Sequence, residues 1–322
     1  MLARVADSLY WMSRYLERVE FSARLVGLQL QRLPVNSAHE IAEGWSLVFR
    51  CLSAHPPGAE SFGEAEDDDY LFADGYALTD FLTFEASNPS SILASLHAAR
   101  ENARQVRDTL SATLWTCLNR TYLGLRGTAL VDEWTKEPER FYAGIVEGVQ
   151  QFDGICHGTL QRGDHWRFMQ LGKYVERAQL VATTLLAHCR GPLPSGADGG
   201  GERWTNALRA CNALEAYGRT HGGDVKGSDA LALLICDPAQ PHSLGFAAQR
   251  LQESLEAVDP PLSGRPPAAP FAALDRISGL LSRCVGAPMP AQQALLVEIL
   301  ESYRNFHGLL EREYVYYPGI PC

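Results

Sequence analysis

The first helix-forming segment of the chain places arginine and glutamate side chains among large aromatic ones. Arg14 lies three residues before Glu17 and four before Arg18, so the three share one helical face. Trp11 and Arg24 lie on the same side. Arginine binds carboxylates and phosphates, while glutamate can orient an arginine, bind an amine or act as a general base. Two alternatives stay open: a buried ion network that joins helices, or a cleft that faces a ligand.

A second charged region follows Pro89 and begins with serines that can cap a helix. Its arginines recur at helical spacing over 100–107 and predict a cationic stripe, which Ser111 extends. The stripe could hold carboxylates or phosphates, or it could pair with the acids of the first helix. The candidate ligand-binding residues of this region are Ser90, Ser91, Arg100, Glu101, Asn102, Arg104 and Arg107.

Helical periodicity dominates the elements that must position these side chains. Apolar residues over 2–33 alternate three- and four-residue steps, which predicts one long helix that Pro34 ends. Strand signals are weak, so we predict an all-α helical bundle. Further helices are expected near 37–54, 91–118, 139–162, 164–190, 203–220, 243–258, 271–286 and 290–313.

The pattern of the first helix occurs a second time. Tyr15-Leu-Glu-Arg18 and Tyr174-Val-Glu-Arg177 lie 159 positions apart (17 to 176), and their flanking apolar residues agree. Asn88-Pro-Ser-Ser-Ile92 and Gln240-Pro-His-Ser-Leu244 form a second matching pair. We therefore predict two pseudo-symmetric repeats, 1–163 and 164–322, as one compact domain or two tightly packed halves. Glu176 and Arg177 are the candidate site residues of the second, less charged copy.

Composition restricts the classes of partner. The chain has 322 residues, 46% of them hydrophobic, and a formal charge of −10 without a basic run, which argues against nucleic acid and anionic membranes. Its apolar stretches are shorter than the roughly 20 residues of a spanning helix, and no signal peptide is evident at its start. We expect a cytoplasmic protein.

Metal sites are not predicted. The eight cysteines show no Cys-x-x-Cys and no histidine pair at ligand spacing, which indicates reduced core thiols. The acidic stretch 64–69 lacks the ligand spacing of a calcium loop and is interpreted as a solvated loop.

The residues Met1-Leu-Ala-Arg-Val-Ala-Asp-Ser-Leu-Tyr-Trp-Met-Ser-Arg-Tyr-Leu-Glu-Arg-Val-Glu20, together with 91–108, closely resemble the bacterial alpha-E family. Gly172-Lys-Tyr-Val-Glu-Arg177 and the Asp237–Ser243 segment extend the resemblance along the chain. It implies an all-helical domain that works with circularly permuted ATP-grasp ligases and transglutaminase-like proteases on peptide or amide-linked products. ATP would then belong to the partner, and no cofactor is required by this sequence.

Three functions are consistent with these observations. The chain could be an accessory or substrate-binding subunit of an ATP-grasp amide-ligase system, holding a peptide or a carboxylate- or phosphate-bearing ligand. It could form or cleave amides itself, with Glu17 or Glu176 as general base. It could also be a structural scaffold in which Glu-Arg pairs only fasten helices.

Overall fold

The structure is a computed structural model, and it describes residues 2–34, 36–58, 74–189, 199–260 and 268–315. These ranges contain helices and turns but no strand, so the prediction of an all-α fold is confirmed. Across the same ranges, every helix is too short or too polar to cross a lipid bilayer.

The chain folds as two compact units. Unit 1 consists of Met1–Arg14 and Gln161–Cys322, and unit 2 consists of Tyr15–Leu160. Helix α1 (Ala3–Leu30) contributes to both, because its first turns belong to unit 1 and its remainder to unit 2.

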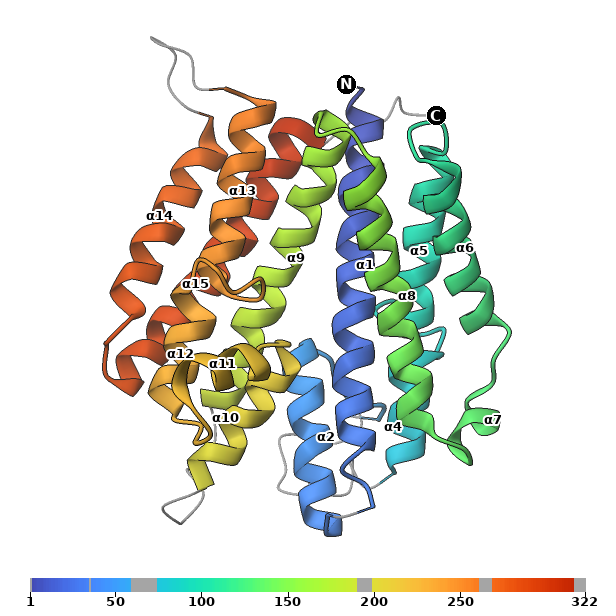
Figure 1. Cartoon of the computed structure of the whole chain (residues 1–322), viewed down its shortest axis with the longest axis vertical. Coiled ribbons are helices and arrows are strands. Elements are labelled where there is room, and N and C mark those ends of the chain that lie inside the picture. The colour runs from blue at the N-terminus through green and yellow to red at the C-terminus, as the bar shows by residue number, and fades with distance from the viewer. Residues whose placement is uncertain (1, 35, 59–73, 190–198, 261–267, 316–322) are drawn as a thin grey trace. The chain divides into compact units, whose positions relative to one another are not determined.

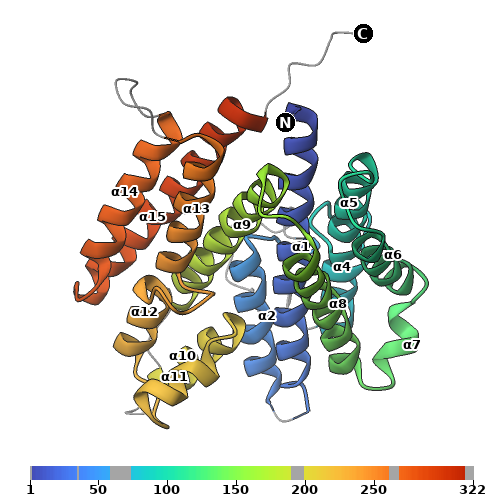
Figure 2. The same cartoon turned by 45° about the horizontal axis from the view of Figure 1, so that its top comes forward.

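Four long helices form the body of unit 1. Helix α9 packs on α13 and α15, and α14 packs on α13 and α15, so the four close into a bundle (Figure 1). Three shorter helices gather at one end of this bundle (Figure 2). The long helices are α9 (Asp164–Cys189), α13 (Leu244–Val258), α14 (Ala269–Cys284) and α15 (Met289–Leu310), and the short ones are α10 (Gly199–Ala210), α11 (Leu214–His221) and α12 (Gly227–Cys236). A π-helical turn, η2 (Glu311–Val315), continues α15.

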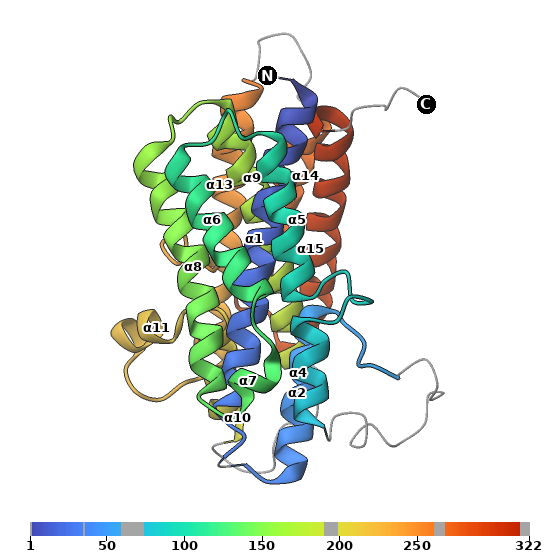
Figure 3. The ribbon, with the colours of Figure 1, turned by 90° about the vertical axis from the view of Figure 1, so that its right-hand side faces the viewer.

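Unit 2 also consists of long and short helices. Helix α6 packs on α5 and α8, and α4 packs on α2 and α5 (Figure 3). Gln150 of α8 donates a hydrogen bond to Glu20 of α1 at 3.2 Å. The helices are α2 (Ala38–Leu52), α4 (Gly75–Thr83), α5 (Ile92–Gln105), α6 (Ala112–Arg126), α7 (Leu130–Trp134) and α8 (Pro138–Thr159).

Two matching turns start α5 and α13. The Ser91 hydroxyl accepts from the amide of Ala94 and the Ser243 hydroxyl from the amide of Phe246, so each serine is the N-cap that the sequence suggested. One turn earlier, the Asn88 and Gln240 carbonyls each accept from the capping serine's own amide. The two turns therefore share both capping and backbone hydrogen bonds.

A tryptophan–glycine contact also occurs once in each unit. The Trp45 indole lies against Gly75, the first residue of α4, and the Trp204 indole lies against Gly227, the first residue of α12. A Cβ at either glycine would press on the indole nitrogen. These local likenesses are consistent with two repeats, and the repeats themselves stay a prediction.

Two of the segments that were expected to be single helices are each divided into two helices. The segment 91–118 is broken, because α5 ends at Gln105 and Ser111 caps α6 by accepting from the amide of Leu114. Arg107 and Ser111 therefore do not extend the stripe of Arg100 and Arg104 along one helix.

The segment 203–220 is likewise divided into α10 and α11, where Asn212 adopts a left-handed backbone conformation (φ 49°). Helices α4, α7 and α12 were not predicted. Most of the acidic loop, much of the glycine-rich 191–201 connector and of the proline-rich 260–270 linker, and nearly all of the C-terminal tail lie outside the described residues.

Candidate functional site

Arg14 and Glu176 form a buried ion pair in unit 1. Arg14 lies on α1 and is 4% exposed, and Glu176 lies on α9 and is 3% exposed. The Nε and Nη2 groups of Arg14 both lie 2.7 Å from Oε2 of Glu176. Because isolated charges are strongly disfavoured in an apolar interior, each residue compensates the other there.

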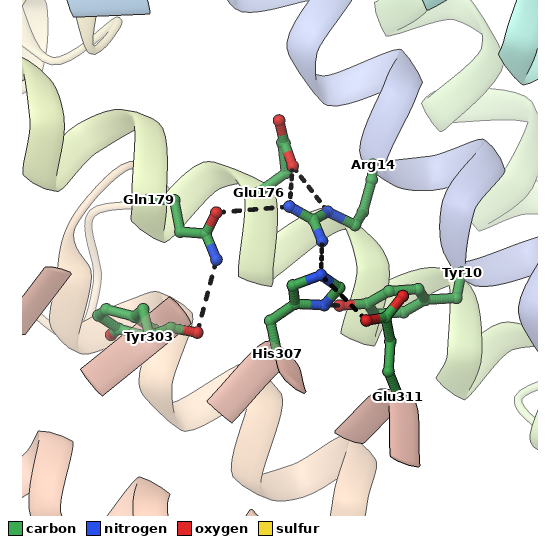
Figure 4. Close-up of polar contacts among 7 residues, drawn as sticks. All are labelled: Tyr10, Arg14, Glu176, Gln179, Tyr303, His307 and Glu311. Carbon is green, nitrogen blue, oxygen red and sulfur yellow. Dashed lines mark hydrogen bonds and ion pairs between the residues drawn. The ribbon is translucent and has the colours of Figure 1, made fainter. Parts of the chain in front are cut away.

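His307 of α15 completes the arginine's surroundings. Nη1 of Arg14 lies 2.8 Å from Nε2 of His307, and the Tyr10 hydroxyl lies 2.7 Å from Nδ1 (Figure 4). A guanidinium can only donate, so Nε2 must be the acceptor and the ring hydrogen of the neutral imidazole must be on Nδ1. The network thus selects one tautomer of His307. Gln179 accepts a longer bond from Nη2 of Arg14 (3.4 Å).

Burial and charge shift the pKa values of this network. Burial alone would lower the pKa of Arg14, but the Glu176 carboxylate outweighs it and the pKa lies above its ordinary value. Burial, and then the Arg14 charge, lower the pKa of His307 to about 4, although Glu176 acts in the opposite direction. Burial also raises the pKa of the Tyr10 hydroxyl. At neutral pH, Arg14 is therefore charged, while His307 and Tyr10 are neutral.

The network reaches solvent at Glu311 and Asp7. Oε2 of Glu311 lies 3.5 Å from Nε2 of His307, and the Glu311 side chain is 35% exposed. Partial burial, and then the Glu311 charge, raise the pKa of Asp7. Trp11 packs edge-on against His307 with 5.6 Å between ring centroids, and the Arg14 guanidinium lies 4.7 Å from the Trp11 centroid.

The second Tyr-x-Glu-Arg segment contributes to the same unit. Arg177 is 5% exposed and donates to the Pro241 carbonyl at 3.2 Å, next to the turn that starts α13. Its guanidinium also lies 5.5 Å from the Tyr174 ring centroid. Glu176 and Arg177 therefore bind to different elements, although they are adjacent in sequence.

Three further candidates of α1, Glu17, Arg18 and Arg24, lie in unit 2. Glu17 is 3% exposed, and the Arg18 guanidinium lies 5.6 Å from the Tyr15 ring centroid. Arg24 forms an ion pair with Glu20, whose Oε1 also accepts from Gln150. Glu20, which was not among the candidates, is thus an ion-pair partner of Arg24.

A more open cluster lies on α5 and α6. Arg100 donates through Nε to Asn119 (2.8 Å) and through Nη1 to Glu101 (2.9 Å). Arg104 binds the other oxygen of Glu101 at 2.8 Å. This hydrogen bond is the main reason that the pKa of Glu101 lies below its ordinary value. The Arg100 and Arg104 side chains are 24% and 64% exposed.

Trp115 of α6 lies at the centre of this cluster. The Cζ atoms of Arg100 and Arg107 each lie 5.5 Å from its ring centroid. Arg100 also lies 5.0 Å from the Tyr122 centroid, and the Tyr122 hydroxyl lies 3.2 Å from Nδ1 of His97. The folded chain thus brings Arg100 and Arg107 to an aromatic residue that sequence reasoning missed, while Glu101 links Arg100 to Arg104.

The other candidates of this region form hydrogen bonds that involve nearby backbone groups. Ser91 is the N-cap of α5, the amide of Ser90 donates to the Asn88 side chain, and Asn102 donates to the Ala98 carbonyl. Sequence reasoning also missed Tyr10, Gln179 and His307 as site residues. One signal for His307 is present in the sequence, because Phe306-His-Gly308 resembles Phe152-Asp-Gly154.

No group of three or more histidine, cysteine or acidic side chains is placed to bind a metal ion within the described ranges. The seven cysteines described there are free thiols. Burial raises the pKa of the Cys189 and Cys284 thiols to about 11, which disfavours the nucleophilic thiolate form.

Comparison with known proteins gives a family match and distant relatives. A family described as a predicted alpha-helical domain with a conserved ER motif matches residues 1–315. An uncharacterized protein of Mycobacterium bovis is 25% identical over 265 residues, which cover 79% of this chain and 29% of the relative.

An uncharacterized protein of Mycobacterium tuberculosis strain H37Rv is 24% identical over the same length, with the same coverage. The chain therefore spans less than a third of these curated relatives. No solved structure matches it.

Proposed function

The chain belongs to the Alpha-E family, and we propose that it is an accessory, substrate-binding domain of an amide- or peptide-forming ligase system. In this proposal, an ATP-grasp-type partner binds ATP and activates a carboxylate, and a transglutaminase-like protease is a further partner of the system. The helical chain holds a peptide, or a ligand that bears a carboxylate or phosphate.

The observation that carries the proposal is the difference between the two arginine clusters. Arg14 is buried and engaged by Glu176, Gln179 and His307. By contrast, Arg100 and Arg107 are partly exposed beside Trp115, and Arg104 is exposed. Arginine is suited to hold carboxylates and phosphates because its planar fork donates two parallel hydrogen bonds. Such a cluster on a rigid helical frame favours binding of an anionic ligand.

The length of the relatives supports a role beside other components. Relatives from two mycobacterial species align with this chain over only 29% of their length. A domain that occurs inside a longer polypeptide commonly acts together with the rest of it. We infer that this chain likewise acts together with further components.

The test is reconstitution with the ATP-grasp-type ligase encoded by the same organism. Purified chain, purified ligase, ATP and candidate amino acids are combined, and new amide products are followed by mass spectrometry. We expect product formation to fall at least tenfold when the chain is omitted, a loss of about 1.4 kcal/mol or more in transition-state stabilisation. Unchanged product formation without the chain would overturn the proposal.

The same experiment distinguishes the enzymatic alternative. If the chain forms or cleaves amides alone, and Glu17→Gln abolishes this turnover, then it is an enzyme with Glu17 as general base. Co-purification of the chain with its partner, followed by mass spectrometry of any retained small molecule, would identify the ligand class directly.

A structural role is the second candidate for the unit 1 network alone. Within the described residues, Arg14 uses Nε, Nη1 and Nη2 on side chains of α9 and α15, and the histidine it binds also contacts Tyr10. Such a saturated network fixes the start of α1 against two helices. Stability losses in Arg14 and Glu176 variants without a defect in product formation would support this role.

A further inference from the structure

We propose that Arg100 and Arg107, flanking Trp115, form a binding site for the phosphate group of a ligand. This inference rests on the proposed function and deepens it by naming the ligand chemistry and the residues. The site lies within unit 2 and is made by α5, the turn at 106–111 and the first turns of α6.

The two guanidinium groups pack against the same tryptophan ring. Each Cζ atom lies 5.5 Å from the same Trp115 centroid, so the two are at most about 11 Å apart. They come from different elements, Arg100 from the helix and Arg107 from the turn that follows it. Breaking the helix at Gln105 therefore sets the direction from which Arg107 approaches Trp115.

Both arginines retain hydrogen-bond donors. Arg100 uses Nε on Asn119 and Nη1 on Glu101, and its Nη2 has no acceptor within the part of the chain that the structure describes. In the same part of the chain, the one acceptor for Arg107 is the Leu110 carbonyl at 3.4 Å, a long bond to Nη1. Five donors per guanidinium thus exceed the acceptors that the folded protein supplies.

The hydrogen bonds of Arg100 also hold it in place. Asn119 accepts from Nε and Glu101 accepts from Nη1, and the Tyr122 and Trp115 rings pack beside the guanidinium. Arg104 in turn holds Glu101 through its second oxygen. Arg100 is therefore oriented before a ligand arrives, which lowers the entropy lost on binding.

Charge and geometry favour phosphate over carboxylate. Three arginines stand beside the carboxylate of Glu101, so these four side chains together carry a net positive charge. A carboxylate has two oxygens in one plane, which suit a single guanidinium fork. A phosphate offers three acceptor oxygens in a tetrahedral arrangement and up to two negative charges, so it can accept from two guanidiniums that approach from different elements.

The test uses inorganic phosphate on the full chain, without a partner. The indole N–H resonance of Trp115, assigned by its loss in Trp115→Phe, is followed by NMR during titration with phosphate and, separately, with acetate. We expect a saturable shift with phosphate at a lower concentration than with acetate. Arg100→Ala and Arg107→Ala should each weaken phosphate binding about tenfold or more, the usual scale for a lost charge-assisted hydrogen bond.

Two further variants separate specific binding from general electrostatics. Arg126→Ala removes one positive charge from the last turn of α6, where the side chain is exposed, and should leave phosphate binding unchanged. Arg107→Lys keeps the charge but loses the fork, and should weaken binding while the helical circular dichroism stays unaltered. A non-saturable shift, tighter binding of acetate, or equal weakening by Arg126→Ala and Arg107→Ala would overturn the site.

The outcomes for this site and for the accessory role can be told apart. If Arg107→Ala abolishes phosphate binding but amide formation with the ATP-grasp partner continues at the wild-type rate, the site stands and its link to the proposed function fails. If phosphate does not bind while the chain still stimulates the partner, the accessory role stands and the phosphate site fails.

Discussion

The imidazole of His307 accepts a hydrogen bond from the guanidinium of Arg14, with 2.8 Å between Nε2 and Nη1. This acceptor role requires a neutral ring, because a protonated imidazole has no lone pair to offer. Protonation would place two cations side by side and turn Nε2 toward Glu311, 3.5 Å away. The stability of unit 1 is therefore linked to the proton on one histidine.

The first prediction concerns pH. The pKa of His307 is lowered to about 4 in the folded chain, from 6.5, so the unfolded chain binds more protons between these values. Stability should therefore be intact above about pH 6.5 and should fall as pH decreases toward 4. We expect His307 to account for roughly 1–3 kcal/mol of that loss, allowing for solvent screening. Urea unfolding at pH 7 and pH 4.5 measures it.

His307→Gln supplies the comparison, since glutamine can accept from Arg14 but does not titrate. The variant should lose less stability than wild type between the two pH values. His39, whose side chain is 66% exposed, is the matched control, and His39→Gln should reproduce the wild-type profile. Parallel profiles for wild type and His307→Gln would contradict the assignment.

The second prediction concerns the buried ion pair. Glu176→Gln leaves the Arg14 charge without its carboxylate and should cost roughly 3 kcal/mol of unfolding free energy. Glu253→Gln is the matched control, because Arg250 and Glu253 form a surface pair with side chains 35% and 40% exposed. The loss of unfolding free energy in Glu253→Gln should stay below about 1 kcal/mol. Equal losses in chemical denaturation would show that burial does not decide the outcome.

The third prediction concerns Gly172, one turn before Glu176 on α9. A Cβ added there would overlap the Tyr10 carbonyl oxygen and lie 2.9 Å from its carbonyl carbon. Gly172→Ala should therefore destabilise the chain by about 3 kcal/mol or more, since backbone atoms must move.

Gly279 is its counterpart in the interior of α14, where an added Cβ meets no heavy atom within 4 Å. Gly279→Ala should stabilise the chain by about 0.5–1 kcal/mol. Thermal unfolding of both variants tests the pair, and a stable Gly172→Ala protein would mean that α1 and α9 do not approach so closely.

The fourth prediction concerns the helix caps. Ser91→Ala and Ser243→Ala each remove an N-cap acceptor and should cost about 1 kcal/mol. Ser243→Ala should cost more, because its hydroxyl also donates to the Asp237 carbonyl at 2.5 Å. Ser90→Ala, at an exposed neighbour, should change the melting temperature little. A loss at Ser90 as large as at Ser91 would contradict the capping assignment.

Much of the fold was predictable, because helix periodicity and capping residues are local properties. The apolar seam of the first helix, the caps at Ser91 and Ser243 and the all-α class all follow from short-range spacing. The break between α5 and α6 was missed because the helical sequence pattern continues through 106–111, whereas in the structure α5 ends at Gln105 and Ser111 caps the start of α6.

The candidate site was harder to predict, because its contacts join residues far apart in sequence. Arg14 was identified, but spacing along one helix pairs it with Glu17 or Arg18, whereas its partners Glu176 and His307 lie on other helices. Trp115 was missed for a similar reason: its importance comes from two arginines outside its own helix.

Tyr10 and His307 are 297 positions apart, yet they share one hydrogen bond in unit 1. Unit 1 is therefore discontinuous along the chain. Tyr10 and Arg14 are synthesised early, but the ribosome must complete α15 before His307, their hydrogen-bond partner, is present. Unit 2, by contrast, is one continuous stretch and is complete once Leu160 has emerged. During synthesis, unit 2 can therefore fold first, and unit 1 can close around Arg14 only after α15 has been made.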